Sequence, residues 1–147
     1  MFHYKSCGLP NVWLKNGYDL RETPYGSSAS IHDLEGLHRV IGLDLVNRAP
    51  ALNGAEIRFL RKELDFSQAQ LARFLGVGET SVRGWENERQ RITPPAERML
   101  RLLYREHVMG DGTVRELVER LSELDREVHR ADKLELEETR EGWRTAA

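Results

Sequence analysis

Between positions 79 and 91 the sequence places several side chains that hydrogen-bond well to nucleic acid. They supply a carboxylate, two hydroxyls, an amide and three guanidinium groups: Glu79, Thr80, Ser81, Arg83, Asn87, Arg89 and Arg91. Groups of these types bond to base edges and to phosphate oxygens of DNA. An arginine bonded to guanine through two nitrogens contributes about 1–3 kcal/mol of discrimination. Side chains of these types are able to bind nucleic acid, and we expect no catalytic residue among them.

Two short helices joined by a tight turn are expected to present these side chains. Ser67 and Gln70 have the spacing of a capping box, which predicts a helix that runs to about Leu75. Gly76 tolerates the positive φ that such a turn requires, and a second helix is predicted over 79–87. The positions that must point inward carry small or apolar residues: Leu71, Ala72, Leu75, Val77, Val82 and Trp85. The joint pattern is typical of a steeply crossed helix pair.

Two further helices are predicted to flank this pair. Residues 55–64 carry apolar side chains at helical spacing. Thr93 followed by Pro94 is typical of a helix start, and this helix is predicted to run to about Val108. The sequence thus predicts a bundle of four to five helices, centred on a domain of residues 53–109. A generic four-helix bundle is the plainer alternative.

The segment 54–107, which includes SQAQLARFLGVGETSVRGWENE at 67–88, resembles the Cro/phage-repressor type of helix-turn-helix, the XRE family. The resemblance implies that the second helix of the pair lies in the major groove. By position, the residues facing base edges are Glu79, Thr80, Ser81 and Arg83. By position, the residues near phosphates are Gln68, Asn87, Arg89 and Arg91. Trp85 and Glu86 match a Trp-Glu pair that is structural in the family.

Two positions depart from the family pattern. Glu79 stands where a neutral or basic residue is common. Its carboxylate repels phosphates, but it can accept a bond from cytosine N4 or pair with Arg83 four residues further on. Because Gly84 has no side chain, we expect it to leave the recognition helix bare at this position. Arg83 is then expected to make much of the sequence-specific contact with the bases.

The N-terminal region, residues 1–52, is predicted to hold a β-hairpin followed by a helix. Asn16-Gly17 is a strong hairpin signal between the apolar runs 12–15 and 18–21, and the segment from Pro24 to Ser28 is expected to end the strands. A helix is predicted over 31–47 with Ser30 as its N-cap, weakened by glycines at 36 and 42.

The order of these parts is similar to that of MqsA-type antitoxins. The resemblance rests on Tyr4, Cys7-Gly8-Leu9, Asn11-Val12, Gly17-Tyr18, Ile31-His32-Asp33-Leu34 and Gly36-Leu37-His38, followed by the helix-turn-helix. In that group a zinc-binding region precedes the DNA-binding module, and the protein represses its own operon and neutralises an RNA-cleaving toxin. The group holds zinc through paired CxxC motifs, whereas Cys7 is the only cysteine of this chain.

Four side chains near the N-terminus nevertheless carry zinc-ligand atoms: His3, Cys7, His32 and His38. Their spacing is not that of a familiar zinc site, so we expect neither a metal nor a cofactor. Cys7 lacks a recognisable base or oxyanion site for nucleophilic catalysis, so we expect no enzymatic activity.

The C-terminal third is predicted to form a helix followed by a tail. Apolar residues spaced three and four apart form a short heptad pattern: Val114, Leu117, Leu121, Leu124, Val128 and Ala131. The helix, within 110–131, is interpreted either as a dimer seam or as another helix of the bundle. The charged residues 132–147 are expected to be disordered. No internal repeat is apparent.

The charge distribution agrees with a central DNA-binding region. The net charge is −2 overall, but residues 54–110 carry +2, whereas residues 1–53 are neutral and 111–147 carry −4. No apolar run approaches the ~18 residues of a membrane span, and the N-terminus has no secretion signal, so a cytoplasmic protein is expected.

The sequence therefore predicts a mainly α protein with a helix-turn-helix bundle and a small N-terminal β-hairpin extension. We expect a sequence-specific repressor that binds a palindromic operator as a homodimer, because one module contacts few base pairs. The leading hypothesis is the autoregulating antitoxin of a type II toxin–antitoxin pair, with a small RNA-cleaving toxin as partner. The alternatives are a free-standing regulator with a sensing N-terminal region and a protein-binding antidote that does not read DNA.

Overall fold

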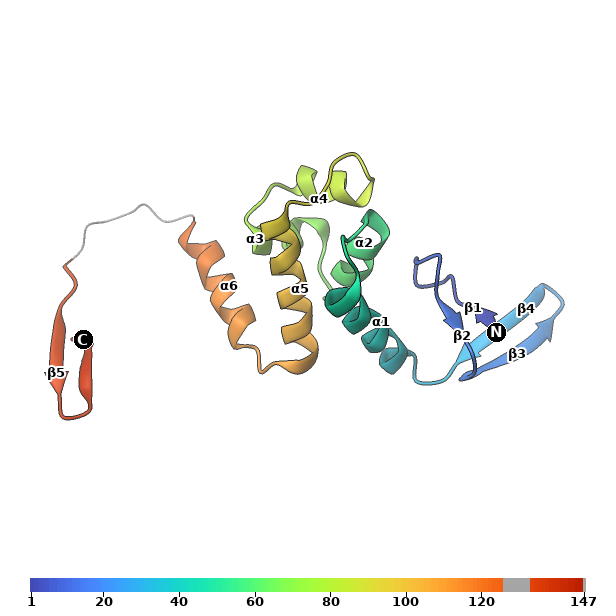
Figure 1. The fold of residues 1–147 in the computed structure, drawn as a ribbon, viewed down its shortest axis with the longest axis horizontal. Coiled ribbons are helices and arrows are strands. Elements are labelled where there is room, and N and C mark those ends of the chain that lie inside the picture. The colour runs from blue at the N-terminus through green and yellow to red at the C-terminus, as the bar shows by residue number, and fades with distance from the viewer. Residues whose placement is uncertain (126–132, 147) are drawn as a thin grey trace.

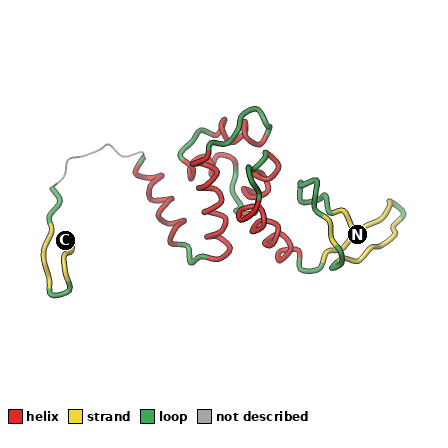
Figure 2. The backbone as a smooth tube through the Cα atoms, in the orientation of Figure 1, coloured by secondary structure: helices red, strands yellow, loops and turns green. Residues whose placement is uncertain are grey.

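Helices make up the centre of the chain and short strand pairs lie towards its two ends (Figures 1 and 2). The computed structural model describes residues 1–125 and 133–146. The helices are α1 (Leu34–Arg48), α2 (Gly54–Glu63), α3 (Gln68–Leu75), α4 (Glu79–Glu86), α5 (Pro94–Met109) and α6 (Thr113–Leu124). The strands are β1 (Phe2–His3), β2 (Trp13–Leu14), β3 (Tyr18–Thr23), β4 (Gly26–Ile31), β5 (Leu136–Thr139) and β6 (Gly142–Thr145). The predicted mainly α class is confirmed.

Local signals set the helix boundaries in the bundle. Ser67 and Gln70 form the predicted capping box, and Asn53 and Glu56 form a second one at the start of α2. Both boxes satisfy backbone N–H groups that have no partner within the helix. Gly76 ends α3 with φ 69°, in the left-handed region that glycine adopts readily. These signals hold α2, α3 and α4 to the predicted lengths within one or two residues.

The core lies between α2, α3, α4 and α5. Its fully buried side chains are Ile57, Leu60, Leu71, Val82, Leu100 and Tyr104. Burying an aliphatic or aromatic side chain of this size stabilises a fold by roughly 1.5–3 kcal/mol. Leu45 and Val46 of α1 join this core, which attaches the N-terminal region to the bundle.

The predicted hairpin at Asn16-Gly17 is wrong. The strand after Gly17, β3, pairs with β4 around a turn at Pro24-Tyr25, and β2 pairs with β1 instead. The β3–β4 ladder contains six residue pairs, whereas β2 is only two residues long and can form only two pairs. The longer ladder therefore determines the pairing, and Pro24 supplies the fixed φ that favours the start of a turn.

The start of α1 also differs from the prediction. The helix begins at Leu34, and its N-cap is Asp33 rather than Ser30. Asp33 accepts a bond from the backbone N–H of Gly36, while Ser30 is the last but one residue of β4 and pairs with Asp19. An aspartate cap is as effective as a serine cap, and the ladder already uses the backbone at Ser30.

Gly42 is the position at which α1 meets α5. A Cβ atom added there would clash with the Tyr104 hydroxyl and ring. The Arg101 guanidinium strengthens the same contact because it donates to the carbonyls of Leu45, Val46, Ala49 and Pro50 at the end of α1. The glycine that weakens the helix in isolation is thus required for its docking.

The helix α6 packs on the bundle as one further helix. Its Val118 is buried, and the Ser122 hydroxyl donates to the carbonyl of Arg73 in α3 at 2.9 Å. The Arg115 guanidinium lies 5.0 Å from the ring centre of Phe66. Leu117, Leu121 and Leu124 are exposed. Val128 and Ala131, the last two positions of the predicted heptad pattern, lie outside the described residues.

The C-terminal segment contains the hairpin β5–β6, where the sequence predicted disorder. It repeats the sequence Leu-x-Glu-Thr-x-x-Gly of the β3–β4 hairpin, at 20–26 and 136–142. In both turns the threonine hydroxyl donates to the glycine carbonyl, and the glycine φ is +117° or +118°. The expectation of no internal repeat is therefore wrong, since a short turn motif occurs at both ends.

Substitution of Gly42 by alanine tests the α1–α5 contact. We expect Gly42→Ala to lower the free energy of unfolding by about 1–3 kcal/mol, because the new methyl overpacks against buried Tyr104. Urea unfolding followed by circular dichroism measures the change. Combining it with Tyr104→Leu, which removes the clashing atoms, must give a loss smaller than the sum of the two single losses. Strict additivity would refute the contact.

Candidate nucleic-acid interface

The helices α3 and α4 form a crossed pair closed by a tight turn. The N–H of Val77 donates to the carbonyl of Ala72 at 3.0 Å, which folds the chain back directly after Gly76. Ala72 is buried where the helices approach each other, and Val82 and Trp85 anchor α4 in the core. These residues were predicted to point inward. The helix axis of α4 is therefore fixed by its buried side.

The opposite side of α4 faces away from the bundle (Figure 1). Glu79, Thr80 and Arg83 are exposed on it, and Ser81 is half-buried. Asn87, Arg89 and Arg91, which follow α4, are exposed as well. The structure thus brings seven of the predicted binding residues onto α4 and the segment that follows it.

Arg83 and Glu79 form an ion pair across one helical turn. The Arg83 Nη2 atom lies 3.2 Å from Glu79 Oε1, and each side chain is about half exposed, at 51% and 49%. The sequence left two roles open for Glu79, a bond from cytosine N4 and a pairing with Arg83. The structure contains the pairing with Arg83. Exposed pairs of this kind contribute only about 0–1 kcal/mol, so ligand contacts can replace it at little cost.

Gly84 does not leave α4 bare, as the sequence suggested. It is buried under Gln90, whose Nε2 atom would lie 2.6 Å from an added Cβ. The backbone N–H groups of Arg89 and Gln90 both donate to the Gly84 carbonyl, so the chain after α4 folds back over this position. Gly84 and Gln90 are six residues apart, and no periodic pattern in the sequence indicates their contact. The contact was therefore not predicted from the sequence.

A buried carboxylate links α4 to α2. Glu86 is 4% exposed, and Arg61 donates to both of its oxygens at 2.7 and 3.0 Å. Arg58 adds a bond at 3.2 Å. Burial alone would raise the pKa of Glu86, but the bonds from Arg61, Gln68 and Arg58 outweigh it and hold the pKa below its usual value. A charged carboxylate thus fixes the end of the recognition helix.

Gln68, the predicted phosphate contact at the start of α3, belongs to the same network. Its Nε2 atom donates to Glu86 Oε1 at 3.3 Å, and the side chain is half-buried. The bond orients the amide while leaving its second N–H and its oxygen available. One side chain therefore ties α3 to α4 and lies at the edge of the predicted DNA-binding face.

The N-terminal side chains considered as zinc ligands do not lie together. His3 stacks on Trp13, His32 contacts Asp19 at 2.7 Å, and the Cys7 thiol donates to the Tyr4 carbonyl. Within residues 1–125 and 133–146, no group of three or more His, Cys, Asp or Glu side chains is placed to hold a metal ion. The residues present therefore do not fit the zinc centre implied by the MqsA-type layout.

His38 instead joins the N-terminal strands to the bundle. Its Nε2 atom lies 2.8 Å from the Tyr4 hydroxyl, and its Nδ1 atom lies 2.7 Å from Glu63 Oε1. Burial raises the pKa of Tyr4, and the nearby Cys7 and Glu63 add to this shift. These polar contacts connect the segment directly after β1 with α1 and α2.

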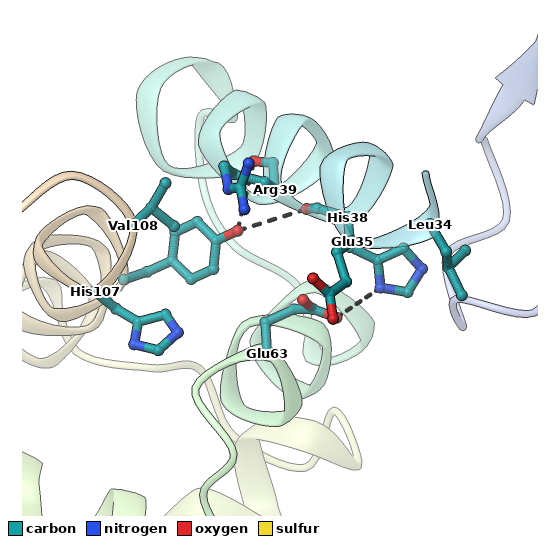
Figure 3. Close-up of a pocket in the computed structure, with 8 residues that line it drawn as sticks. Leu34, Glu35, His38, Arg39, Glu63, His107 and Val108 are labelled. Atoms are coloured by element: carbon teal, nitrogen blue, oxygen red, sulfur yellow. Dashed lines mark hydrogen bonds and ion pairs between the residues drawn. The ribbon is translucent and has the colours of Figure 1, made fainter. Parts of the chain in front are cut away.

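A pocket of about 390 Å³ lies beside His38, between α1, α2 and α5 (Figure 3). Its lining is mostly polar: Leu34, Glu35, His38, Arg39, Glu63, Tyr104, His107 and Val108. Figure 3 shows His38 turned towards Glu63, with His107 across the opening. The pocket lies where the N-terminal region meets the DNA-binding domain.

Comparison with known families agrees with this geometry. Residues 57–103 match the helix-turn-helix family model HTH_3, the XRE type, so α2 to α5 are a DNA-binding helix-turn-helix domain of that family. The match supports a DNA-binding transcriptional regulator. No curated protein and no solved structure matches the chain. None of the helices in the described part of the chain has the length and apolar composition to cross a membrane.

Replacing Glu86 by glutamine tests the buried network. At neutral pH we expect Glu86→Gln to lower the free energy of unfolding by about 3 kcal/mol, because Arg61 and Arg58 lose their counter-charge in a buried setting. The lowered pKa means that the carboxylate stabilises the fold above the unfolded-state value near 4.5. This contribution disappears as the pH falls through the lower folded-state value.

The difference between wild type and Glu86→Gln must therefore shrink on acidification, as measured by urea unfolding at about pH 7 and pH 3. The exposed Glu79→Gln is the matched control and is expected to change stability by less than about 0.5 kcal/mol. A gap that stays constant with pH would contradict a charged Glu86 in the native state.

Proposed function

We propose that this regulator is a repressor that binds a palindromic operator as a homodimer, and that it is the autoregulating antitoxin of a type II toxin–antitoxin pair. The observation that carries the DNA-reading part is the polar outer face of α4, held rigid by Trp85 and Glu86 on its buried side. A rigid helix with exposed polar groups suits the major groove, and two copies would reach half-sites about 34–36 Å apart.

The exposed residues divide into two roles in this proposal. Base edges are read by Glu79, Thr80, Ser81 and Arg83. Phosphates are held by Gln68, Asn87, Arg89 and Arg91. The division follows their positions, since the first set lies on α4 and the second lies at the start of α3 and in the segment after α4. Phosphate contacts position the protein, whereas base contacts specify the sequence.

Arg83→Ala tests the reading role. We expect a loss of preference at one base-pair position, because a bidentate bond to guanine contributes about 1–3 kcal/mol, or roughly 5–150-fold in affinity. Binding to a library of operator variants, selected from genomic DNA bound to the protein, measures it. Gln68→Ala is expected to weaken binding to all sequences alike.

Arg21→Ala on β3 is the control for the loss of one exposed arginine. Unchanged preference across the library in Arg83→Ala would exclude Arg83 from base reading. Binding that does not weaken as salt is added would favour the alternative of a protein-binding antidote, because DNA binding releases counterions.

Exposed apolar residues at both ends of the chain support the antitoxin role. Leu20 and Tyr25 on the first repeated hairpin are 60% and 101% exposed, and Leu136 and Trp143 on the second are 54% and 72% exposed. A protein partner that covers these residues would remove apolar surface from water, which stabilises a complex. Isolated two-stranded hairpins are marginal in water, so a partner would also stabilise the hairpins.

Purification of the full-length protein from its own cells tests the pairing with a toxin. We expect a small basic protein to co-purify in a fixed ratio, to degrade RNA when freed, and to be encoded in the neighbouring reading frame. Mass spectrometry and an RNA-cleavage assay measure this. Recovery of the regulator with its DNA but without such a protein would refute the antitoxin role.

The pocket beside His38 favours a second candidate, a regulator that senses a ligand through its N-terminal region. A polar cavity between α1 and α5 is lined by Tyr104, the residue that packs against Gly42, so a bound molecule would affect the docking of α1. Operator binding that changes when cell metabolites are added would support this candidate over the antitoxin.

A further inference from the structure

The helix α6 presents two different faces. Towards the bundle it directs Val118 and Ser122, and its Glu119 lies 3.8 Å from Arg73 of α3. A second face carries leucines that nothing in the described part of the chain covers. These leucines, which we call the α6 stripe, are Leu117, Leu121 and Leu124, exposed by 59%, 49% and 42%.

The α6 stripe has the spacing of a coiled-coil seam. Leu117 and Leu124 fall at d positions and Leu121 at the a position between them. Val118, which is buried against the bundle, falls at an e position beside the seam. Anchoring through Val118 and Ser122 holds α6 in place, so pairing with another helix would not have to order it first.

The charges beside the stripe are complementary between two copies. Arg120 falls at a g position and Asp125 at the e position of the next heptad. In a parallel pair these positions face each other across the seam, and such pairs set partner and orientation. Asp125 also follows the last residue of α6, where a negative charge is unfavourable to the helix dipole and a cation from a partner would offset it.

We infer that the α6 stripe is the surface on which a second copy of this chain docks, with the two α6 helices parallel. Each copy places Leu117, Leu121 and Leu124 against the same residues of the other, and each Arg120 faces the partner's Asp125. This inference names the dimer contact of the proposed repressor and rests on that proposal for its biological purpose. The contact itself needs no DNA.

The molar mass in solution tests the inference directly. The full-length protein, free of DNA, is expected to be a dimer in sedimentation and light-scattering experiments. The variant Leu117→Asp/Leu121→Asp is expected to raise the dimer dissociation constant at least about 30-fold, because it places charges in the centre of the interface. Leu102→Asp, at a leucine of α5 that is 48% exposed, is the matched control and must leave the mass unchanged.

Disulfide cross-linking tests the orientation of the pair. In a Cys7→Ser background, Leu121→Cys is expected to form an intersubunit disulfide readily, since an a residue of a parallel pair meets its own counterpart. Glu116→Cys, which is exposed but lies off the stripe, must not do so. Failure of Leu121→Cys to cross-link, in a variant with unchanged circular dichroism, would overturn the inference.

A charge exchange tests the complementary pair. Arg120→Asp and Asp125→Arg must each weaken the dimer, and the double variant must recover affinity relative to both. Arg120 also bonds Glu123 within its own helix at 3.2 Å, so helix content is followed in parallel. A double variant no stronger than the single ones would overturn the parallel pairing.

Failure of this inference is distinguishable from failure of the proposed function. A protein that is monomeric without DNA but still binds its operator overturns the α6 contact alone. A protein that dimerises through α6 but does not bind DNA overturns the proposed reading of the operator alone.

Discussion

The buried carboxylate of Glu86 is the constraint on which the DNA-binding geometry depends. It receives bonds from Arg58 and Arg61 of α2 and from Gln68 of α3 while it stands at the end of α4. A buried charge is costly unless every oxygen is bonded, so a rotation of α4 that broke these bonds would leave the carboxylate uncompensated. The network therefore does more than add stability. It selects one orientation of the recognition helix relative to its two neighbours.

The backbone around Glu86 reinforces this orientation. The start of α2 lies so close to the end of α4 that a Cβ on Gly54 would come within 2.5 Å of the Glu86 carbonyl oxygen. The N–H of Gly54 donates to Glu88, which itself adopts the left-handed conformation with φ 60°. Backbone packing and the ion pairs thus act on the same junction. On its outer side α4 makes the weak Glu79–Arg83 pair and contacts Gln90, which covers Gly84 and donates to the Ser81 carbonyl.

Features encoded within a few residues were predictable from the sequence, and features that join distant residues were not. The capping box at Ser67, the turn at Gly76 and the inward positions Val82 and Trp85 follow from local chemistry and helical periodicity, and the structure has them. The network joins Glu86 to residues 18 to 28 positions away in the sequence, so no local sequence pattern predicts it. The predicted hairpin at Asn16-Gly17 is wrong for the same reason. The strongest local turn signal lies there, but β3 instead forms the longer ladder with β4.

The pairing of Glu79 with Arg83 bears on which bases the proposed interface prefers. When the guanidinium turns to a guanine, the carboxylate loses its partner next to a highly negative groove, and this repulsion lowers the net gain. The loss is offset where Glu79 accepts a bond from cytosine N4. One helical turn separates the two side chains, so both contacts fall on the same or adjacent base pairs. In the proposed interface the pair would therefore favour a guanine whose own cytosine, or the cytosine of an adjacent base pair, places its N4 group within reach of Glu79, and a site with no N4 group in reach would leave the carboxylate uncompensated.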